Sequence, residues 1–225
     1  MATRLHDEIV PILDFGAQYS QLIARRVREA GVFSELVRPD ISVEELRAKN
    51  PKGIILSGGP KSVYEPGAPH CDPRLFELNV PVLGICYGMQ LGVQLLGGAV
   101  KPAPAREFGR AKLKVIKNDA LVRGLPESTT VWMSHGDQVH DLPSDFIALA
   151  TTPTCPFAAT KHAKLPFYGV QFHPEVTHTP RGEQIFHNFL YEICKCTGTW
   201  TMGSFVEDSI DRIRKQVGKS RVICG

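Results

Sequence analysis

Apolar residues in the first hundred positions follow two alternating periods. Continuous runs rich in Val, Ile and Leu have the length of strands buried on both faces, and they cover residues 9–15, 32–37, 53–57 and 80–85. Between them apolar residues recur at helical spacing, over 18–30 and again from 87 to the Gly97-Gly98 stop. Ser42, with Glu45 three residues later, predicts one more helix start. This alternation predicts an α/β fold with a doubly wound, mostly parallel sheet flanked by helices.

Beyond Gly98 the pattern changes to short apolar stretches. They predict strands at 112–116, 130–133, 147–151, 157–161 and 167–172. Because Pro and Gly breaks separate them, we expect antiparallel strands that extend the sheet. The polar residues 134–137 interrupt this region and, taken alone, predict a loop. A helix with one apolar face is predicted over 181–196.

The last residues differ in character from the rest. Residues 198–203 predict a linker, and Ser204 with Glu207 predicts a capping box that opens a helix. Residues 220–224 predict a strand without a partner, and intact proteins avoid such open edges. We therefore expect a fragment, with one domain at 1–199 and, at 200–225, a linker and the truncated start of a second domain.

A candidate nucleophile, Cys86, lies where a strand period changes to a helix period. Gly84 and Gly88 flank it, and Gly-x-Cys-x-Gly has the form of a nucleophile elbow with cysteine in place of serine. The positive end of a helix stabilises a thiolate, which predicts a reactive sulfur. The alternative is a small buried apolar residue.

A candidate base and its partner follow an apolar run far downstream, at His173 and Glu175. Pro174 keeps His173 out of the helical region, and in an extended segment residues two apart face the same way. An imidazole that a carboxylate orients can activate a cysteine. Read alone, His-Pro-Glu would be a turn with a solvated glutamate.

Composition narrows the classes of function. Of the 225 residues, 43% are apolar and 22% charged, and a net charge of +3 is too small to indicate nucleic-acid binding. No run is long enough to span a membrane, and the first eight residues lack the apolar core of a signal peptide, so we expect a cytoplasmic protein. The six cysteines show no disulfide or metal-ligand spacing, and we expect reduced thiols and no metal.

Several motifs together carry a family resemblance. The elbow 84–90 and the segment 172–175 resemble the two diagnostic motifs of class I (triad) glutamine amidotransferases. Residues 12–20 resemble the opening of the glutaminase domains of GMP synthases, residues 55–60 their oxyanion loop and residues 133–139 their glutamine-binding loop.

The resemblance implies a role for each matching residue. Cys86, His173 and Glu175 would be the catalytic triad, and the backbone amides of Gly59 and Tyr87 would form the oxyanion hole. The remaining residues would bind glutamine; they are Gln90, Ser134, His135, Gly136 and Asp137.

The implied reaction is hydrolysis of glutamine to glutamate and ammonia through a cysteine thioester. In the complete enzyme, a homodimer, the ammonia would pass to a synthetase (ATP pyrophosphatase) domain of the same polypeptide. There ATP and Mg²⁺ would support amination of xanthosine monophosphate to GMP. No cofactor is expected in this chain, and the Ser-Gly-Gly-Val-Asp-Ser phosphate loop of that second domain does not occur in it.

Two other classes of function fit part of the pattern. A γ-glutamyl peptidase or related Cys-His-Glu hydrolase would use the same elbow and histidine. An inactive docking module would need none of the triad side chains, whereas all three residue types are present.

Overall fold

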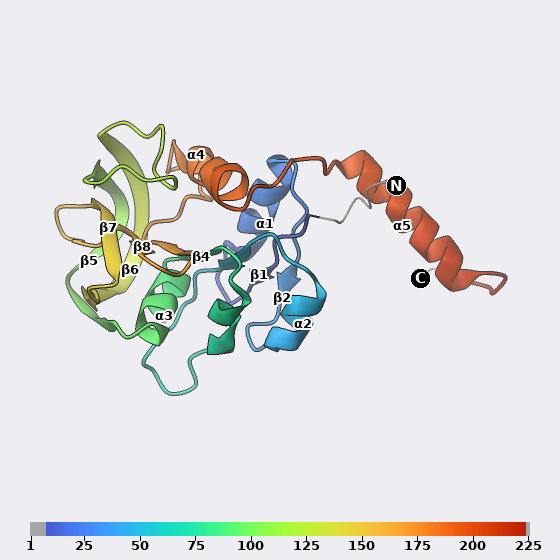
Figure 1. Cartoon of the computed structure of the whole chain (residues 1–225), viewed down its shortest axis with the longest axis horizontal. Helices are drawn as coiled ribbons and strands as arrows, with labels where there is room; N and C mark the ends of the chain where they lie inside the picture. The colour runs from blue at the N-terminus through green and yellow to red at the C-terminus, as the bar shows by residue number, and fades with distance from the viewer. Residues whose placement is uncertain (1–7, 224–225) are drawn as a thin grey trace.

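Figure 1 shows a central sheet with helices packed against both of its faces. The computed structural model describes residues 8–223. Its nine-stranded sheet has the order β2-β1-β3-β4-β9-β8-β7-β5-β6. The strands are β1 Ile12–Leu13, β2 Leu36–Val37, β3 Ile54–Leu56, β4 Val82–Ile85, β5 Ala99–Val115, β6 Ser128–Asp141, β7 Phe146–Thr151, β8 Ala159–His162 and β9 Phe167–Val170.

Two kinds of strand pairing divide the sheet. The strands from β2 to β9 in this order pair in parallel, and β8, β7, β5 and β6 add an antiparallel extension. The predicted fold class, a mostly parallel sheet with an antiparallel extension, is confirmed. The helices are α1 Ser20–Glu29, α2 Val43–Ala48, α3 Tyr87–Leu95, α4 Gly182–His187 and α5 Met202–Val217, with a 3₁₀ helix η1 Pro73–Leu78 and a π-helix η2 Asn188–Ile193.

The parallel strands are apolar throughout because their alternate residues enter two different cores. In β4, Leu83 and Ile85 pack with the apolar faces of α1, α4 and η2, whereas Val82 packs with Met89 of α3 and with η1. Ile12 and Leu13 of β1 divide in the same way. Each fully buried aliphatic side chain contributes about 1.5–3 kcal/mol. The sheet is thereby held between two helical layers.

The strand bounds differ from the predicted ones in both halves. The parallel strands are shorter than their apolar runs, whereas the predicted 112–116 and 130–133 are parts of the long β5 and β6. The predicted loop at 134–137 is wrong, because these residues lie within β6, where Ser134, His135 and Asp137 pair with β5. Pairing of the two long strands supplies hydrogen bonds that local polarity does not reveal.

The carboxyl-terminal helices also differ in detail. The predicted helix over 181–196 consists of α4 followed by η2. The capping box predicted at Ser204 is wrong: Thr201 caps α5, and its hydroxyl accepts a hydrogen bond from the Ser204 amide at 3.2 Å. The first helical residue is therefore Met202. The capping box predicted at Ser42 is confirmed.

The end of the described chain is irregular. Residues 220–223 form no strand, contrary to prediction, and position 224 lies outside the described residues. Helix α5 extends away from the sheet in Figure 1, and its apolar side chains are exposed at Met202, Val206, Ile210 and Ile213. None of the helices in residues 8–223 combines the length and apolar character needed to cross a bilayer.

Two glycines let α3 begin directly against the sheet. A Cβ on Gly88 would lie 2.2 Å from the carbonyl oxygen of Leu56 in β3, and a Cβ on Gly84 would lie 2.5 Å from the amide nitrogen of Met89. Both contacts are with backbone, which cannot move aside. The β4–α3 junction therefore requires glycine at both positions.

Replacement of Gly88 tests this packing. We expect Gly88→Ala to lower the free energy of unfolding by about 3 kcal/mol or more, because the methyl group must displace β3 or α3. Gly203→Ala is the control, since the nearest atom to its Cβ is 3.9 Å away on Thr201. It should change stability by no more than about 1 kcal/mol. Urea titration of both variants provides the measurement, and equal stability of the two would contradict the packing argument.

Candidate active site

The backbone at Cys86 is strained. Cys86 has φ 52° and ψ −105° as the residue that precedes α3, and such a conformation costs a residue with a side chain about 1–3 kcal/mol. Its amide donates to the carbonyl of Val170 in β9 at 2.8 Å, which fixes the turn. The side chain lies at the amino-terminal end of α3, with the residue 6% exposed.

Three adjacent parallel strands bring their carboxyl ends to this cysteine. A Cβ on Gly58, after β3, would lie 3.4 Å from His173 Cε1 and 4.0 Å from Cys86 Cβ. Gln171, after β9, donates from Nε2 to Cys86 Sγ at 3.5 Å. The structure thus places the sulfur and the imidazole side by side, although 87 positions separate Cys86 from His173 in the sequence.

His173 and Glu175 form a buried pair. Nδ1 of His173 lies 2.7 Å from Oε1 of Glu175, and the two residues are 5% and 1% exposed. The His173 amide donates to the carbonyl of Trp132 at 2.9 Å, and the His173 carbonyl accepts from Thr179 Oγ1 at 2.7 Å. The ring of Tyr19 meets the imidazole edge-on at 5.7 Å. These contacts fix the orientation of the ring.

The surroundings of His173 favour its charged form. Burial by itself lowers the pKa of His173, but hydrogen bonds and charge interactions with Cys86 and Glu175 outweigh it and raise the pKa to about 10. A protonated imidazole next to the sulfur stabilises the thiolate. The geometry therefore supports a thiolate–imidazolium pair at neutral pH.

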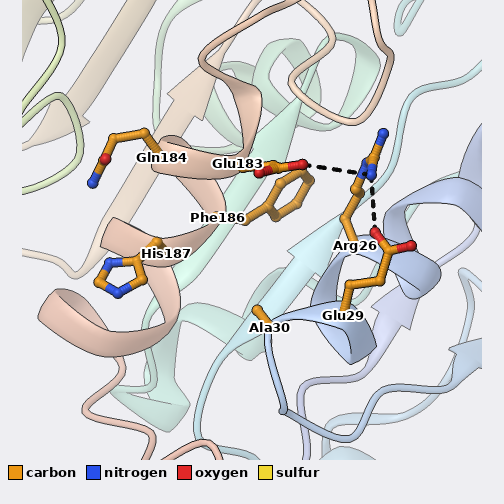
Figure 2. Close-up of a pocket in the computed structure, with 7 residues that line it drawn as sticks. All are labelled: Arg26, Glu29, Ala30, Glu183, Gln184, Phe186 and His187. Carbon is orange, nitrogen blue, oxygen red and sulfur yellow. Dashed lines mark hydrogen bonds and ion pairs between the residues drawn. The ribbon is translucent and has the colours of Figure 1, made fainter.

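Arg26 of α1 holds the backbone of the glutamate from behind. Its Nε donates to the carbonyl oxygen of Glu175 at 3.0 Å, while Nη1 lies 2.9 Å from Glu29 and 3.8 Å from Glu183. Figure 2 shows this guanidinium between α1 and α4, beside a pocket of about 590 Å³. No predicted site residue lines that pocket. We therefore assign Arg26 the part of anchoring the loop that carries Glu175.

Two backbone amides are free beside Cys86. Within residues 8–223 the amides of Gly59 and Tyr87 have no hydrogen-bond acceptor. A Cβ on Gly59 would lie 3.0 Å from Tyr87 Cγ and 3.1 Å from the Phe15 carbonyl oxygen, so only glycine fits there without displacement. Free amides next to a nucleophile are the groups that stabilise an oxyanion.

A cavity of about 580 Å³ opens in front of the sulfur. Most of the predicted site residues line it: Gly59, Cys86, Tyr87, Gln90, Ser134, His135, Gly136 and Asp137. His173 and Glu175 do not line the cavity and stand behind the sulfur. One cavity thus collects residues that follow β3 and β4 and residues of β6.

Gln90 and Asp137 connect the two sides of this cavity. Gln90 donates from Nε2 to the Asp137 carbonyl at 2.8 Å and to Gln171 Oε1 at 3.0 Å, so its amide joins α3 to β6. The Asp137 carboxylate accepts from Tyr64 at 2.8 Å and from the hydroxyl of Ser62. Both donors are neutral, so the negative charge of Asp137 is not balanced by them.

A cluster behind the cavity contains the donor types of a metal site. Ligand atoms of Glu107, His135 and Cys155 lie within 4.8 Å of one another. However, His135 Nε2 is already 3.0 Å from Glu107 Oε2, and burial raises the pKa of Cys155 to about 12, which keeps its thiol protonated. We therefore regard this cluster as a hydrogen-bonded support for β6.

Sequence reasoning missed two of these residues. Gln171 lies two positions before His173 and four before Glu175, so the alternation used for the histidine would have placed it on the same side. Glu107 carried no local signal, because its partners His135 and Thr152 come from distant parts of the chain.

Comparison with known proteins gives the family. The protein-family model described as glutamine amidotransferase class-I matches residues 11–193 of this chain. The chain belongs to the class I glutamine amidotransferase family. A glutamine-hydrolyzing GMP synthase of Macrococcus caseolyticus is 53% identical over 224 residues, which are 100% of this chain and 44% of that protein. One of Staphylococcus carnosus is 54% identical over 217 residues, 96% of this chain and 42% of that protein. This amidotransferase chain spans less than half the length of these relatives.

Solved structures agree with the fold. A Thermoplasma acidophilum protein described as a candidate GMP synthase subunit is 34% identical, with a TM-score of 0.76, over 92% of this chain and 97% of that one. A glutamine amidotransferase from Thermotoga maritima has a TM-score of 0.59 at 22% identity, over 94% and 93% of the two chains. At 22% identity, the similarity to the Thermotoga maritima structure supports the fold of this chain and nothing further.

Alkylation tests the thiolate of this amidotransferase. In a Cys224→Ser background at pH 7, we expect iodoacetamide to modify Cys86 before Cys71 and Cys155, because burial raises the pKa of each of those two thiols to about 12. Glu175→Gln removes a group that raises the pKa of His173, so the Cys86 rate at pH 7 should fall by about tenfold.

Peptide mass spectrometry over a pH series measures both effects. In wild type the rate should change little from pH 7 to about pH 10, because the sulfur is already ionised beside the protonated His173. In Glu175→Gln the rate should rise with pH over the same range, because less imidazolium is present at pH 7 to favour the thiolate. Equal labelling of Cys71 and Cys86 would argue against the ion pair.

Proposed function

We propose that this chain is the glutaminase part of a GMP synthase and hydrolyses glutamine to glutamate and ammonia. The observation that carries the proposal is the joint placement of Cys86, His173 and Glu175, with the sulfur on the wall of a cavity and the 2.7 Å imidazole–carboxylate pair behind it. The relatives that match 96–100% of the chain are named as glutamine-hydrolyzing GMP synthases, which supports the same activity.

The chemistry proceeds in two steps. The Cys86 thiolate attacks the side-chain carboxamide carbon, and the amides of Gly59 and Tyr87 stabilise the oxyanion. The carbon–nitrogen bond breaks as His173 gives its proton to the leaving nitrogen, so ammonia and a γ-glutamyl thioester form. His173, held by Glu175, then takes a proton from water, which attacks the thioester and releases glutamate and the thiolate.

Glutamine itself would be bound by the residues that line the cavity. We assign its α-amino and α-carboxylate groups to Ser134, His135, Gly136 and Asp137, partly through their backbone groups. In this structure Gln90 hydrogen-bonds to β6, so part of its contribution is to hold that wall in place.

The activity of the complete protein is part of the same proposal. The relatives are more than twice as long as this chain, which supports a synthetase part that follows the glutaminase domain in the same polypeptide. There the ammonia would aminate xanthosine monophosphate, with ATP and Mg²⁺ bound by that part. We propose a domain boundary near residue 199, so that α5 with its exposed apolar face belongs to the second part. We also propose that the full-length protein is a homodimer.

Cys86→Ala should lower glutamate release from glutamine by at least about a thousandfold, because among the described residues that line the cavity only Cys86 carries a thiol that can form the thioester. Cys71→Ala is the matched control, since Cys71 is buried away from the cavity, and it should keep the activity. The assay compares glutamine with a γ-glutamyl peptide. Equal activity of wild type and Cys86→Ala would exclude the mechanism, and hydrolysis of the peptide alone would favour the peptidase.

A further inference from the structure

Arg106 stands at the rim of the glutamine cavity. The β5–β6 ladder shifts register between Pro102 and Glu107, so the segment that ends at Arg106 leaves the regular pairing. Arg106 lines the cavity, and its Nε would be 3.8 Å from a Cβ on Gly136. Within residues 8–223 no carboxylate pairs with this guanidinium.

The residue next to Arg106 fixes this part of β5. The Glu107 side chain is 11% exposed, and its carboxylate lies 3.0 Å from His135 Nε2 and accepts from Thr152 Oγ1 at 3.0 Å and from the Thr154 hydroxyl. His135 belongs to β6, and the two threonines follow β7. This buried anchor holds the backbone on which Arg106 projects, so the guanidinium reaches the cavity from a supported position.

The charges around the cavity complement a free amino acid. Asp137 offers a carboxylate whose partners, Ser62 and Tyr64, are neutral. Lys61 also lines the cavity, but its Nζ is engaged, since it donates to the Gly67 carbonyl at 3.0 Å. Among the described residues that line the cavity, Arg106 is therefore the arginine or lysine whose charged group has no hydrogen-bond or ion-pair partner. A zwitterion places an ammonium and a carboxylate on one carbon atom and requires one group of each sign.

We propose that Arg106 binds the α-carboxylate of glutamine, opposite Asp137, and so selects free glutamine over glutamine whose α-carboxylate is amidated. The proposal rests on the proposed glutaminase function. A guanidinium can bind a carboxylate through two parallel hydrogen bonds, which makes it more selective than a single charge. The residue is thus a specificity determinant of the cavity rather than a part of the triad.

Two alkylating reagents test this role without requiring turnover. The chloroketone analogue of glutamine carries the α-ammonium and α-carboxylate groups, whereas iodoacetamide carries neither. Arg106→Gln should slow modification of Cys86 by the chloroketone by roughly 10–100-fold, the loss expected for a charge-assisted pair, and leave the iodoacetamide rate unchanged. Arg106→Lys should restore part of the chloroketone rate. Arg110→Gln is the matched control, because Arg110 is exposed on β5 and does not line the cavity.

A third reagent, the chloroketone with its α-carboxylate amidated, isolates the charge. It should react slowly with wild type, at a rate that Arg106→Gln does not change. Equal slowing of all reagents in Arg106→Gln would indicate a structural role and overturn the inference, as would an unchanged chloroketone rate. If the chloroketone does not modify wild-type Cys86 faster than iodoacetamide does, the glutaminase proposal itself fails.

Discussion

The close contact between the first turn of α3 and β3 is the constraint on which the rest of the site depends. Gly88 lies against the Leu56 carbonyl, and its amide donates to the Ser57 carbonyl at 3.0 Å. That contact pulls the turn inward and holds Cys86 in a conformation that a residue with a side chain rarely adopts. The sulfur therefore lies at the end of a helix, on the wall of the cavity. The close packing of α3 against β3 prevents the strained backbone of Cys86 from relaxing.

The electrostatic surroundings of Cys86 differ from those of the other described cysteines. Burial raises the pKa of Cys71 and Cys155 to about 12 and that of Cys196 to about 11, so their thiols stay protonated at neutral pH. Cys86 is comparably buried, but it has an imidazolium beside it. The buried Glu175 holds Nδ1 of that ring at 2.7 Å with one carboxylate oxygen, while its other oxygen has no hydrogen-bond partner among residues 8–223. The arrangement favours charge on the sulfur.

How much could be predicted depended on the range of the interactions. The parallel half of the sheet was predictable because each of its strands is apolar throughout, and the elbow at Cys86 because its glycines adjoin it in sequence. The long β5 and β6 were not, since their polar residues become strand only by pairing with each other. Arg106 and Glu107 could not be predicted for the same reason. The position of Arg106 depends on a register shift between β5 and β6, and the hydrogen-bond partners of Glu107 are distant in the sequence.

The hydroxyl of Thr179 accepts from the Trp132 amide at 3.0 Å and donates to the His173 carbonyl at 2.7 Å. The Thr179 side chain thus connects the backbone of the catalytic base, His173, to β6, the strand that also contributes residues to the cavity wall. The His173 amide also donates to the Trp132 carbonyl at 2.9 Å, so two hydrogen-bonded routes join the backbone of the base to β6. A change in the position of β6 would therefore act on the cavity wall and on the catalytic base at the same time.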